Sequence, residues 1–390
     1  MKIFVLLSRV PYPLDKGDKL RAFNQIKELS KKHTIILCAL SDKPVNSEAK
    51  QVLSEYCAHV ETIPLSYTGI AINLIKAFIS GKPLQVGYFY QSSINEKIKK
   101  LINFHKPDHI YCQLIRVSEY VKYFATKKTL DYMDALSKGM ERRKEKGHFL
   151  LKPIFKIESK RLKKYETDIF SFFDNKTIIS IQDRDFISHD ANQLISVVPN
   201  GVDAAFYVPN HIKQKDYDLL FTGNMNYPPN IECAEYIAKE ILPEVQKIKP
   251  GTRLLISGVN PSASVLALQS EFITVTGWVK DLRESYSRSK IFIAPMRIGT
   301  GLQNKLLEAM AMQLPCITSE LANNALGATH NKNILIGNKT ADYTAHVIEL
   351  LENEELKQRI ANNGCLFVQE NYNWKSSVEL LNSIILKLQL

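Results

Sequence analysis

Short runs rich in β-branched residues alternate with helix-like segments along nearly the whole 390-residue chain. Strands that are separated by helical connections pair in parallel, and parallel sheets carry helices on both faces. The sequence therefore predicts an α/β protein built from doubly wound sheets. The strands are expected at residues 2–8, 33–40, 108–114, 128–133 and 177–181 in the first half, and at 194–199, 217–223, 252–258, 272–277, 291–295 and 315–319 in the second.

The length and composition predict two domains, because 390 residues with 45% hydrophobic content exceed what one core normally holds. The segment "PNGVDAAFYVPN" (199–210) combines Pro, Asn-Gly and Pro-Asn, which are turn-forming residues. We place the hinge near it, so that residues 1–198 form the first domain and 199–372 the second. Doubly wound sheets bind ligands at the carboxyl ends of their strands, and two facing domains would form a functional cleft.

No apolar run approaches the roughly 20 residues needed to span a bilayer, and the N-terminus shows no signal-peptide pattern. The sequence therefore predicts a cytoplasmic protein. Its six cysteines are scattered without a C-x-x-C pair, which indicates reduced core thiols.

The net charge of +11 is concentrated in residues 138–164, which hold 11 Lys/Arg against 3 Glu. No recognised nucleic-acid module accompanies this segment, so a nucleic-acid partner is not expected. Two interpretations stay open: a solvated lysine-rich helix, or a surface for an anionic membrane or a lipid diphosphate. Residues 68–89 mix apolar side chains with lysines, which favours a first domain that rests peripherally on the cell membrane.

The loop after the first expected strand contains Gly17, followed by a helix with Asp18 as its expected N-cap. A glycine before a helix N-terminus can bring bare backbone close to an anion, although a single loop glycine is ordinarily only a turn.

The stretch "GTGLQNKLLEAMAMQLP" (299–315) predicts a second loop of this kind. Thr300 and Gln303 match a capping box, which would leave the amides of Gly301 and Leu302 free to face a phosphate. Lys305 and Glu308 are then neighbours on one helix edge. They form either a surface ion pair or a nucleoside diphosphate site, with the ammonium on the diphosphate and the carboxylate on the ribose hydroxyls.

In combination and order, several segments resemble the retaining GT-B glycosyltransferases of the family 4 type, including those of bacterial exopolysaccharide and capsule clusters. The segments are the Gly17 loop, "VVPNGVD", "LLFTGNMNYPPN", "VTGWVKDLRESYSRSKIFIAP", "EAMAMQLPCITS" and "NYNWKSSVELL". The resemblance covers nearly the whole chain and implies a GT-B fold with two facing Rossmann-like domains. It also implies that residues 373–390, around Trp374, form a helix that crosses back to the first domain.

The resemblance further implies the roles of the site residues. Glu308 would bind the ribose hydroxyls and Lys305 the diphosphate, and Arg297 would add a donor, so that these three are the candidate catalytic residues. The other candidate donor-binding residues are Gly17, Gly223, Gly277, Trp278, Val279, Thr300, Gly301, Leu302 and Asn304.

The chain departs from the family pattern in two places. Thr300 stands where the family commonly has a second glutamate, eight residues before Glu308. The loop "GNMNYPPNI" lacks the Arg and Lys that many relatives carry there, so Lys305 and Arg297 must supply most of the positive charge. The donor sugar therefore stays open.

The predicted function is retaining transfer of a sugar from a nucleotide diphosphate sugar to a hydroxyl acceptor, such as a polyprenyl-diphosphate-linked surface glycan, without a metal. Two alternatives remain: a GT-B sugar-nucleotide epimerase and a non-catalytic GT-B subunit. Asp183 and Asp185 of "DRD" resemble a metal-binding pair, although helix capping is the favoured interpretation. Asp131 and Asp134 follow a strand and could either meet an acceptor or belong to the core edge.

Overall fold

The computed structural model describes residues 1–146, 151–203, 206–208, 215–298 and 302–387. The chain forms two compact units: unit 1 comprises Met1–Pro199 and Trp374–Leu390, and unit 2 comprises Asn200–Asn373. Each boundary lies one residue after the predicted one, and the terminal helix groups with unit 1.

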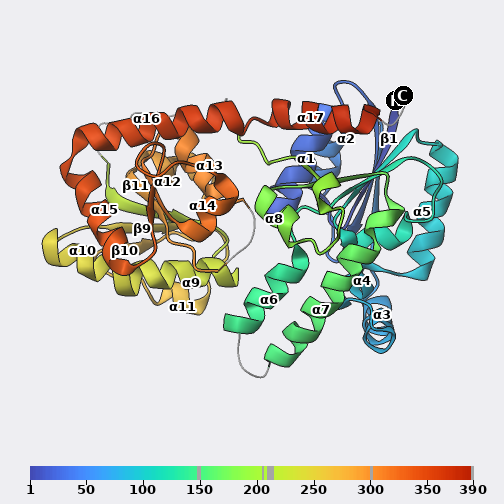
Figure 1. The fold of residues 1–390 in the computed structure, drawn as a ribbon, viewed down its shortest axis with the longest axis horizontal. Helices are drawn as coiled ribbons and strands as arrows, with labels where there is room; N and C mark the ends of the chain where they lie inside the picture. The colour runs from blue at the N-terminus through green and yellow to red at the C-terminus, as the bar shows by residue number, and fades with distance from the viewer. Residues whose placement is uncertain (147–150, 204–205, 209–214, 299–301, 388–390) are drawn as a thin grey trace. The chain divides into compact units, whose positions relative to one another are not determined.

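Unit 1 contains a parallel sheet of seven strands in the order β3-β2-β1-β4-β5-β6-β7 (Figure 1). Phe4 in β1, an interior strand, pairs with Ile36 on one side and Ile110 on the other. Successive β1 residues enter two different hydrophobic cores, because side chains alternate between the faces of a strand and helices cover both faces. The strands are β1 (Lys2–Leu7), β2 (Thr34–Ser41), β3 (His59–Pro64), β4 (His109–Gln113), β5 (Lys128–Asp131), β6 (Asn175–Ile178) and β7 (Ser196–Val197).

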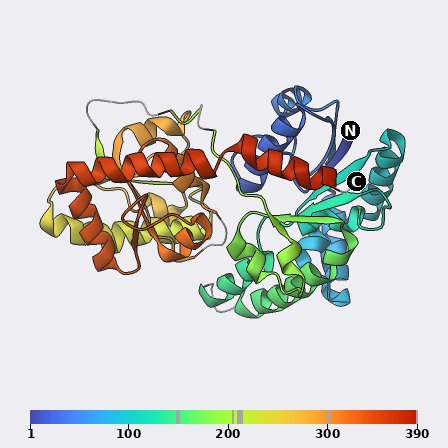
Figure 2. The ribbon, with the colours of Figure 1, turned by 45° about the horizontal axis from the view of Figure 1, so that its top comes forward.

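The last helix of the chain packs against the first helix of unit 1 (Figures 1 and 2). His33 Nε2 lies 2.6 Å from Asn382 Oδ1, and Asn175 Nδ2 donates to Ile384 O at 2.8 Å. The helices are α1 (Gly17–Leu29), α2 (Ser47–Ser54), α3 (Tyr67–Ser80), α4 (Leu84–Phe89), α5 (Ser92–His105), α6 (Leu136–Lys146), α7 (Lys152–Asp168), α8 (Ile181–Phe186) and α17 (Trp374–Leu386), with short 3-10 turns η1 (Ile115–Tyr120), η3 (Phe170–Phe172) and η4 (Asn192–Leu194).

The basic segment 138–164 spans most of α6 and the first part of α7, which pack along each other as a helical hairpin (Figure 1). Among the described residues, no helix is both long and apolar enough to cross a bilayer.

Unit 2 contains a second parallel sheet, of six strands in the order β10-β9-β8-β11-β12-β13. Its strands are β8 (Tyr217–Thr222), β9 (Leu254–Ser257), β10 (Ile273–Val275), β11 (Ser289–Ala294), β12 (Cys316–Ser319) and β13 (Leu335–Gly337). Its helices are α9 (Pro228–Tyr236), which continues through a π-helical turn η5 (Ile237–Ile241) into α10 (Leu242–Ile248), α11 (Ala263–Leu266), α12 (Leu282–Ser287), α13 (Asn304–Ala311), α14 (Glu320–Leu326), α15 (Thr340–Glu352) and α16 (Glu354–Asn371).

Three strands differ from the prediction. The strand expected at 194–199 is β7, which pairs with β6 at the edge of the unit 1 sheet rather than in the second half. The edge strands β3 and β13 were not expected. Edge strands carry weaker sequence signals because only one neighbour and part of one face bury them, and most of β3 is only half-buried.

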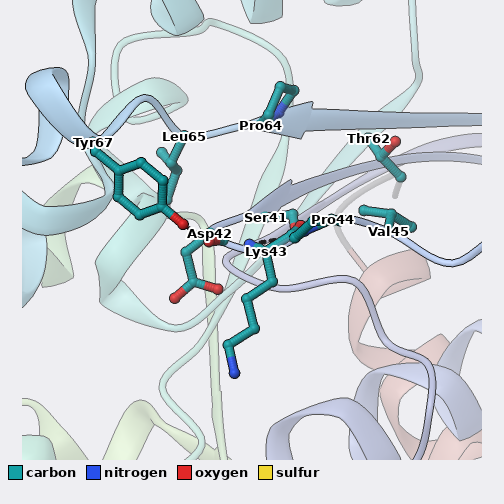
Figure 3. A pocket seen from close by; sticks show the side chains of 9 residues that line it. All are labelled: Ser41, Asp42, Lys43, Pro44, Val45, Thr62, Pro64, Leu65 and Tyr67. Carbon is teal, nitrogen blue, oxygen red and sulfur yellow. Dashed lines mark hydrogen bonds between the residues drawn. The ribbon is translucent and has the colours of Figure 1, made fainter.

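A hollow of 410 Å³ lies at the carboxyl ends of β2 and β3 in unit 1 (Figure 3). Its charged lining residues are Asp42 and Lys43, and Tyr67 at the start of α3 lies beside them. None of the site residues predicted from the sequence lines this hollow, as far as the described residues go.

Candidate active site

The strand order of unit 2 reverses between β8 and β11, which lie next to each other at the centre of the sheet. The chain leaves β8 toward α9 and leaves β11 toward α13. Doubly wound sheets bind ligands at the carboxyl ends of their strands at such a switch point. Lys305 and Glu308 lie on α13 and therefore belong to this part of the unit.

The ammonium of Lys305 is held by neutral groups. Its Nζ donates to Asn230 Oδ1 at 2.5 Å and lies 4.6 Å from the centre of the Phe221 ring. Burial lowers the pKa of Lys305 to about 8, although the nearby negative charge of Glu308 partly opposes this. A cation that has lost water without gaining a bonded carboxylate is favourable for an anionic ligand.

Gly223 follows β8 and lies beside Lys305. A Cβ atom on Gly223 would lie 2.6 Å from Asn230 Nδ2 and 3.2 Å from Lys305 Nζ. A Cβ on Gly258, which follows β9, would lie only 1.8 Å from Gly223 O. Side chains larger than glycine would therefore push the strand ends and the lysine apart.

Two tyrosine hydroxyls hold the carboxylate of Glu308. Tyr286 on α12 donates to Glu308 Oε2 at 2.8 Å, and Tyr207 also donates to the carboxylate. Burial raises the pKa of Glu308, while these two hydroxyls and Lys305 oppose the rise. Lys305 and Glu308 thus bond different neutral partners, which argues against a simple surface ion pair between them.

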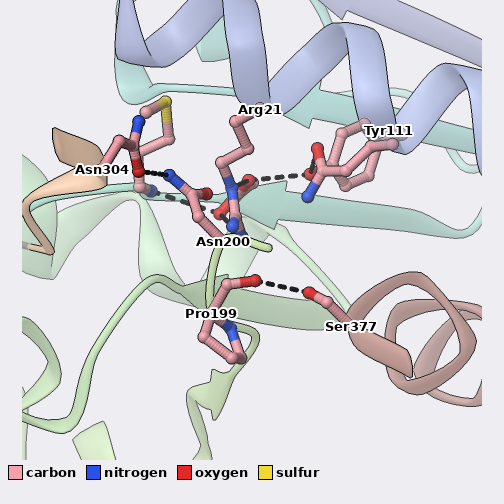
Figure 4. A network of polar contacts seen from close by, with 9 residues as sticks. Arg21, Tyr111, Pro199, Asn200, Asn304 and Ser377 are labelled. Carbon is pink, nitrogen blue, oxygen red and sulfur yellow. Dashed lines mark hydrogen bonds and ion pairs between the residues drawn. The ribbon is translucent and has the colours of Figure 1, made fainter. Parts of the chain in front are cut away.

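The start of α13 differs from the predicted capping box. The helix begins at Asn304 with Gln303 as its N-cap, so Gln303 is not the third helical residue, and Leu302 is a buried loop residue before it. The backbone is extended at Gln303, where φ is −88° and ψ is 98°. Asn304 Oδ1 accepts from Asn200 Nδ2 at 3.0 Å (Figure 4). Thr300 and Gly301 lie outside the described residues.

The segment Gly277, Trp278 and Val279 follows β10 at the same edge of the sheet. Gly258 N donates to Gly277 O at 3.2 Å, so the strand ends of β8, β9 and β10 adjoin through their glycines. The indole of Trp278 is 70% exposed and Val279 is half-buried. An exposed indole offers a flat surface on which a nucleobase can stack.

Residues 216–353 match the sequence model of the family described as Glycosyl transferases group 1, and this range contains Gly223, Lys305 and Glu308. Solved structures with the GT-B fold match over the whole chain. Sucrose-phosphate synthase from Thermosynechococcus elongatus matches with a TM-score of 0.72 at 13% identity, covering 100% of this chain and 99% of that one. The protein is a glycosyltransferase with the GT-B fold.

Two further similarities extend over nearly the whole glycosyltransferase. An uncharacterized 44.6 kDa protein in the cps region of Klebsiella pneumoniae is 26% identical over 96% of this chain and 97% of that protein. Anabaena HepE, solved in complex with UDP-glucose, matches with a TM-score of 0.69 at 11% identity, covering 98% of both chains.

Arg297 of the glycosyltransferase, predicted as a donor to the diphosphate, is bonded to acidic groups. Its Nε donates to Glu232 Oε1 at 2.6 Å, and its Nη1 lies 3.8 Å from Glu240 Oε1. The guanidinium also lies 3.8 Å from the centre of the Tyr236 ring. The structure therefore brings Lys305 and Gly223 together, whereas Arg297 is held against α9 and η5.

In unit 1 of the glycosyltransferase, Gly17 is the first residue of α1, but the N-cap is Lys16 rather than Asp18. Asp18 lies in the first turn of the helix, where its carboxylate accepts from Arg9 Nη1 at 2.5 Å. The prediction for Asp18 was wrong because the helix already begins at Gly17, which makes Asp18 its second residue.

The structure separates the two aspartates that follow β5. Asp131 is fully buried and paired with Arg21, with 2.6 Å between Asp131 Oδ2 and Arg21 Nε, so it belongs to the core edge. Figure 4 shows Arg21 with Tyr111, whose hydroxyl lies 2.8 Å from Asp131 Oδ2. Asp134 is half-buried, and no hydrogen bond is recorded for its carboxylate among the described residues.

The first aspartate of "DRD" takes part in helix capping but is not the cap. Ser180 is the N-cap of α8 and accepts from Asp183 N at 3.1 Å, while Ser180 Oγ donates to Asp183 Oδ2 at 2.6 Å. Asp183 therefore lies in the first helical turn.

Asn230, Tyr207 and Tyr286, the neutral partners of the two charged groups, were not predicted from the sequence. Asn230 and Tyr286 lie in segments that carry the family resemblance, "LLFTGNMNYPPN" and "VTGWVKDLRESYSRSKIFIAP", and Tyr207 lies in the predicted hinge segment "PNGVDAAFYVPN". Their pairing with Lys305 and Glu308 depends on contacts between residues 75 and 22 positions apart for Asn230 and Tyr286, which helix periodicity does not reveal.

Proposed function

We propose that the enzyme transfers a sugar, with retention of its anomeric configuration, from a nucleoside diphosphate sugar to a hydroxyl acceptor. Lys305 binds the diphosphate and Glu308 binds the ribose hydroxyls. The acceptor oxygen forms a bond to the anomeric carbon, the bond from that carbon to the diphosphate breaks, and the acceptor proton passes to the departing diphosphate oxygen.

One observation carries the proposal: a lysine and a glutamate lie at the switch point of a group 1 domain, and within the described residues the hydrogen-bonding partners of each are neutral. The lysine is short of negative charge and the carboxylate keeps lone pairs beyond those used by two tyrosines. A diphosphate and a vicinal diol supply the missing partners of both groups.

Positive charge at the leaving group comes from Lys305, so transfer needs no metal in this proposal. Gly223 lets the backbone approach the diphosphate. Trp278, Gly277 and Val279 line the pocket for the nucleobase. Thr300, Gly301, Leu302 and Asn304 are further proposed donor contacts. HepE was solved with UDP and UDP-glucose, which makes a uridine nucleotide the first donor to test.

A panel of UDP, GDP, ADP and CMP in a thermal-shift assay tests the donor site, since a ligand at 100 times its dissociation constant adds about 2.7 kcal/mol of stability. We expect one diphosphate to stabilise the protein and Glu308→Ala to abolish that shift. Unchanged stabilisation in Glu308→Ala would refute the donor-site assignment. The anomeric configuration of the product, read by NMR, separates retention from inversion.

For the acceptor, we propose a lipid-linked surface glycan at an anionic membrane. The relative from a cps region supports a role in surface polysaccharide synthesis. A lipid-linked acceptor requires the enzyme to reach the membrane surface.

The helices α3 and α7 provide a surface suited to that contact. Arg161 of α7 donates to Phe78 O of α3 at 2.9 Å, so the two helices lie together. Exposed large apolar side chains occur on both helices and just before α7, and the sequence from residue 62 to 95 contains no acidic residue. These apolar residues are Ile72, Ile75, Phe78 and Ile79 on α3, and Leu151, Ile154 and Ile157 at α7. Exposed lysines on α7 are Lys152, Lys156, Lys160, Lys163 and Lys164.

Vesicle co-sedimentation tests this surface. We expect binding to vesicles that contain phosphatidylglycerol, little binding to neutral vesicles, and weakening with salt. Ile75→Ser with Ile79→Ser should reduce binding, whereas Phe104→Ser, which removes an equally exposed ring from α5, should not. Equal binding by all variants would exclude the α3 and α7 surface.

A further inference from the structure

Three charged side chains at the centre of the unit 1 sheet are not used by the proposed donor chemistry. The strand order of this sheet reverses between β1 and β4. Arg9 follows β1, Arg116 lies in η1 directly after β4, and Asp134 follows β5. All three therefore stand at the carboxyl edge of the sheet, around its switch point, where doubly wound domains bind ligands.

Arg116 is a partly buried cation that has a neutral amide as its hydrogen-bonding partner. Its Nε and Nη2 donate to Gln85 Oε1 at 3.0 and 2.8 Å, and its guanidinium lies 5.8 Å from the centre of the Phe89 ring. No ion pair joins Arg116 to a carboxylate among the described residues. Burial, followed by the positive charge of Arg9, lowers the pKa of Arg116 to about 10.

Charges of both signs surround Arg116: Arg9 and Arg143 lower its pKa, whereas Asp18 and Asp134 oppose that effect. Arg9 is already paired with Asp18, and Arg21 with Asp131. A guanidinium that has no anionic hydrogen-bonding partner can bind a phosphate or a carboxylate through two parallel hydrogen bonds.

Asp134 faces the same group of charges. Burial and the neighbouring Asp183 raise the pKa of Asp134 to about 8, although Arg21 and Arg116 oppose the rise. Asp183 is itself bonded to Ser180, whereas the half-buried Asp134 carboxyl has no recorded side-chain partner in the described part of the chain. A carboxyl group in this state can accept from, or donate to, a substrate hydroxyl.

We propose that the switch-point residues of unit 1 bind an acceptor that carries an anionic group. Arg116, supported by Arg9, binds the anion, and Asp134 hydrogen-bonds a neighbouring hydroxyl of the acceptor. The inference rests on the proposed glycosyl transfer, and it restricts the acceptors to anionic molecules. The anion is either the diphosphate of a lipid carrier or the carboxylate of an acidic sugar.

Binding of small probes to the full-length protein tests the inference. The probes are farnesyl diphosphate, farnesol, glucuronate and glucose, measured by calorimetry with the donor site saturated by whichever nucleoside diphosphate stabilises the protein most. Saturation keeps the probe anions away from Lys305. We expect one anionic probe to bind and its neutral counterpart not to bind.

Arg116→Gln should lower the affinity for the anionic probe by about 10- to 100-fold, as expected for losing charge-assisted hydrogen bonds. Arg359→Gln, which removes one positive charge from α16 of unit 2, is the matched control and should bind like the unmodified protein. Arg116→Lys keeps the charge and should retain part of the affinity.

The outcomes separate the two proposals. Farnesyl diphosphate binding alone identifies a lipid diphosphate, and glucuronate binding alone identifies an acidic sugar. The inference would be overturned if neither anionic probe bound. It would also be overturned if Arg116→Gln and Arg359→Gln bound the anionic probe with equal affinity. If no nucleoside diphosphate raised the melting temperature of the unmodified protein, the donor-site proposal would be overturned instead, because that shift does not involve Arg116.

Discussion

Arg21 in unit 1 and Lys305 in unit 2 lie on helices that each follow a strand at the switch point of its sheet. Arg21 and its partner Asp131 are fully buried and satisfy each other's charge. Lys305 is held by the amide of Asn230, and its pKa is lowered to about 8 by burial. The difference separates a charge that serves the fold from one that remains available to a ligand.

The same distinction applies to the other arginines. Arg297 is paired with Glu232, whereas Arg116 has the neutral partner Gln85. Charged residues at the strand ends can therefore be sorted by the charge of their partners, and substitution of each kind should change a different property.

Arg21→Met should have the largest effect and should act on stability. Removing one member of a buried ion pair costs about 3 to 5 kcal/mol because the other charge stays buried without its partner. Denaturant unfolding of the full chain measures the change. The double variant Arg21→Met with Asp131→Asn should recover part of the lost stability. If Arg21→Met were as stable as the unmodified protein, the distinction between charges that serve the fold and charges that serve a ligand would not hold.

Lys305→Met should act on function instead. We expect transfer to fall by about 10²- to 10³-fold, as for loss of one group that stabilises a developing negative charge, with little change in the unfolding free energy. Arg297→Met is the matched control and should reduce transfer less, because Glu232 already neutralises that guanidinium. If Lys305→Met and Arg297→Met lost the same share of transfer activity, both residues would be assigned to diphosphate binding.

Glu308→Gln should lower the affinity for the nucleoside diphosphate by about 10- to 100-fold, since hydrogen bonds to a charged acceptor are lost. Tyr207→Phe should have a smaller effect, because Tyr286 still donates to the carboxylate. Titration calorimetry gives both values. A larger loss in Tyr207→Phe than in Glu308→Gln would contradict a positioning role for Tyr207.

The pH dependence of nucleotide binding should be the mildest effect. The pKa of Lys305 is lowered, so the ammonium loses its proton as the pH rises through about 8, well below the usual range for lysine. The dissociation constant should therefore increase above pH 8, by about tenfold per pH unit at most. Lys305→Arg stays charged and should flatten this profile, and a profile unchanged by that substitution would place the titration elsewhere.

The sequence predicted most strands but not the edge strands β3 and β13, whose half-buried or short segments lack a continuous apolar run. It identified Lys305 and Glu308 because their spacing on a helix is a local property. It placed the start of that helix too early, because the local capping-box pattern made Gln303 the third helical residue, whereas Gln303 is the N-cap.

By itself, the sequence determined the two parallel α/β domains and the loops that carry the candidate site, because strand and helix periodicity and turn residues act over short distances. Only the tertiary structure decided which charges are neutralised. Asp131 and Asp134 are three residues apart and equivalent in the sequence, yet the first meets Arg21 and the second remains half-buried beside Asp183. Partners such as Asn230 for Lys305 come from distant segments, and their solvation is set by packing rather than by neighbours in the chain.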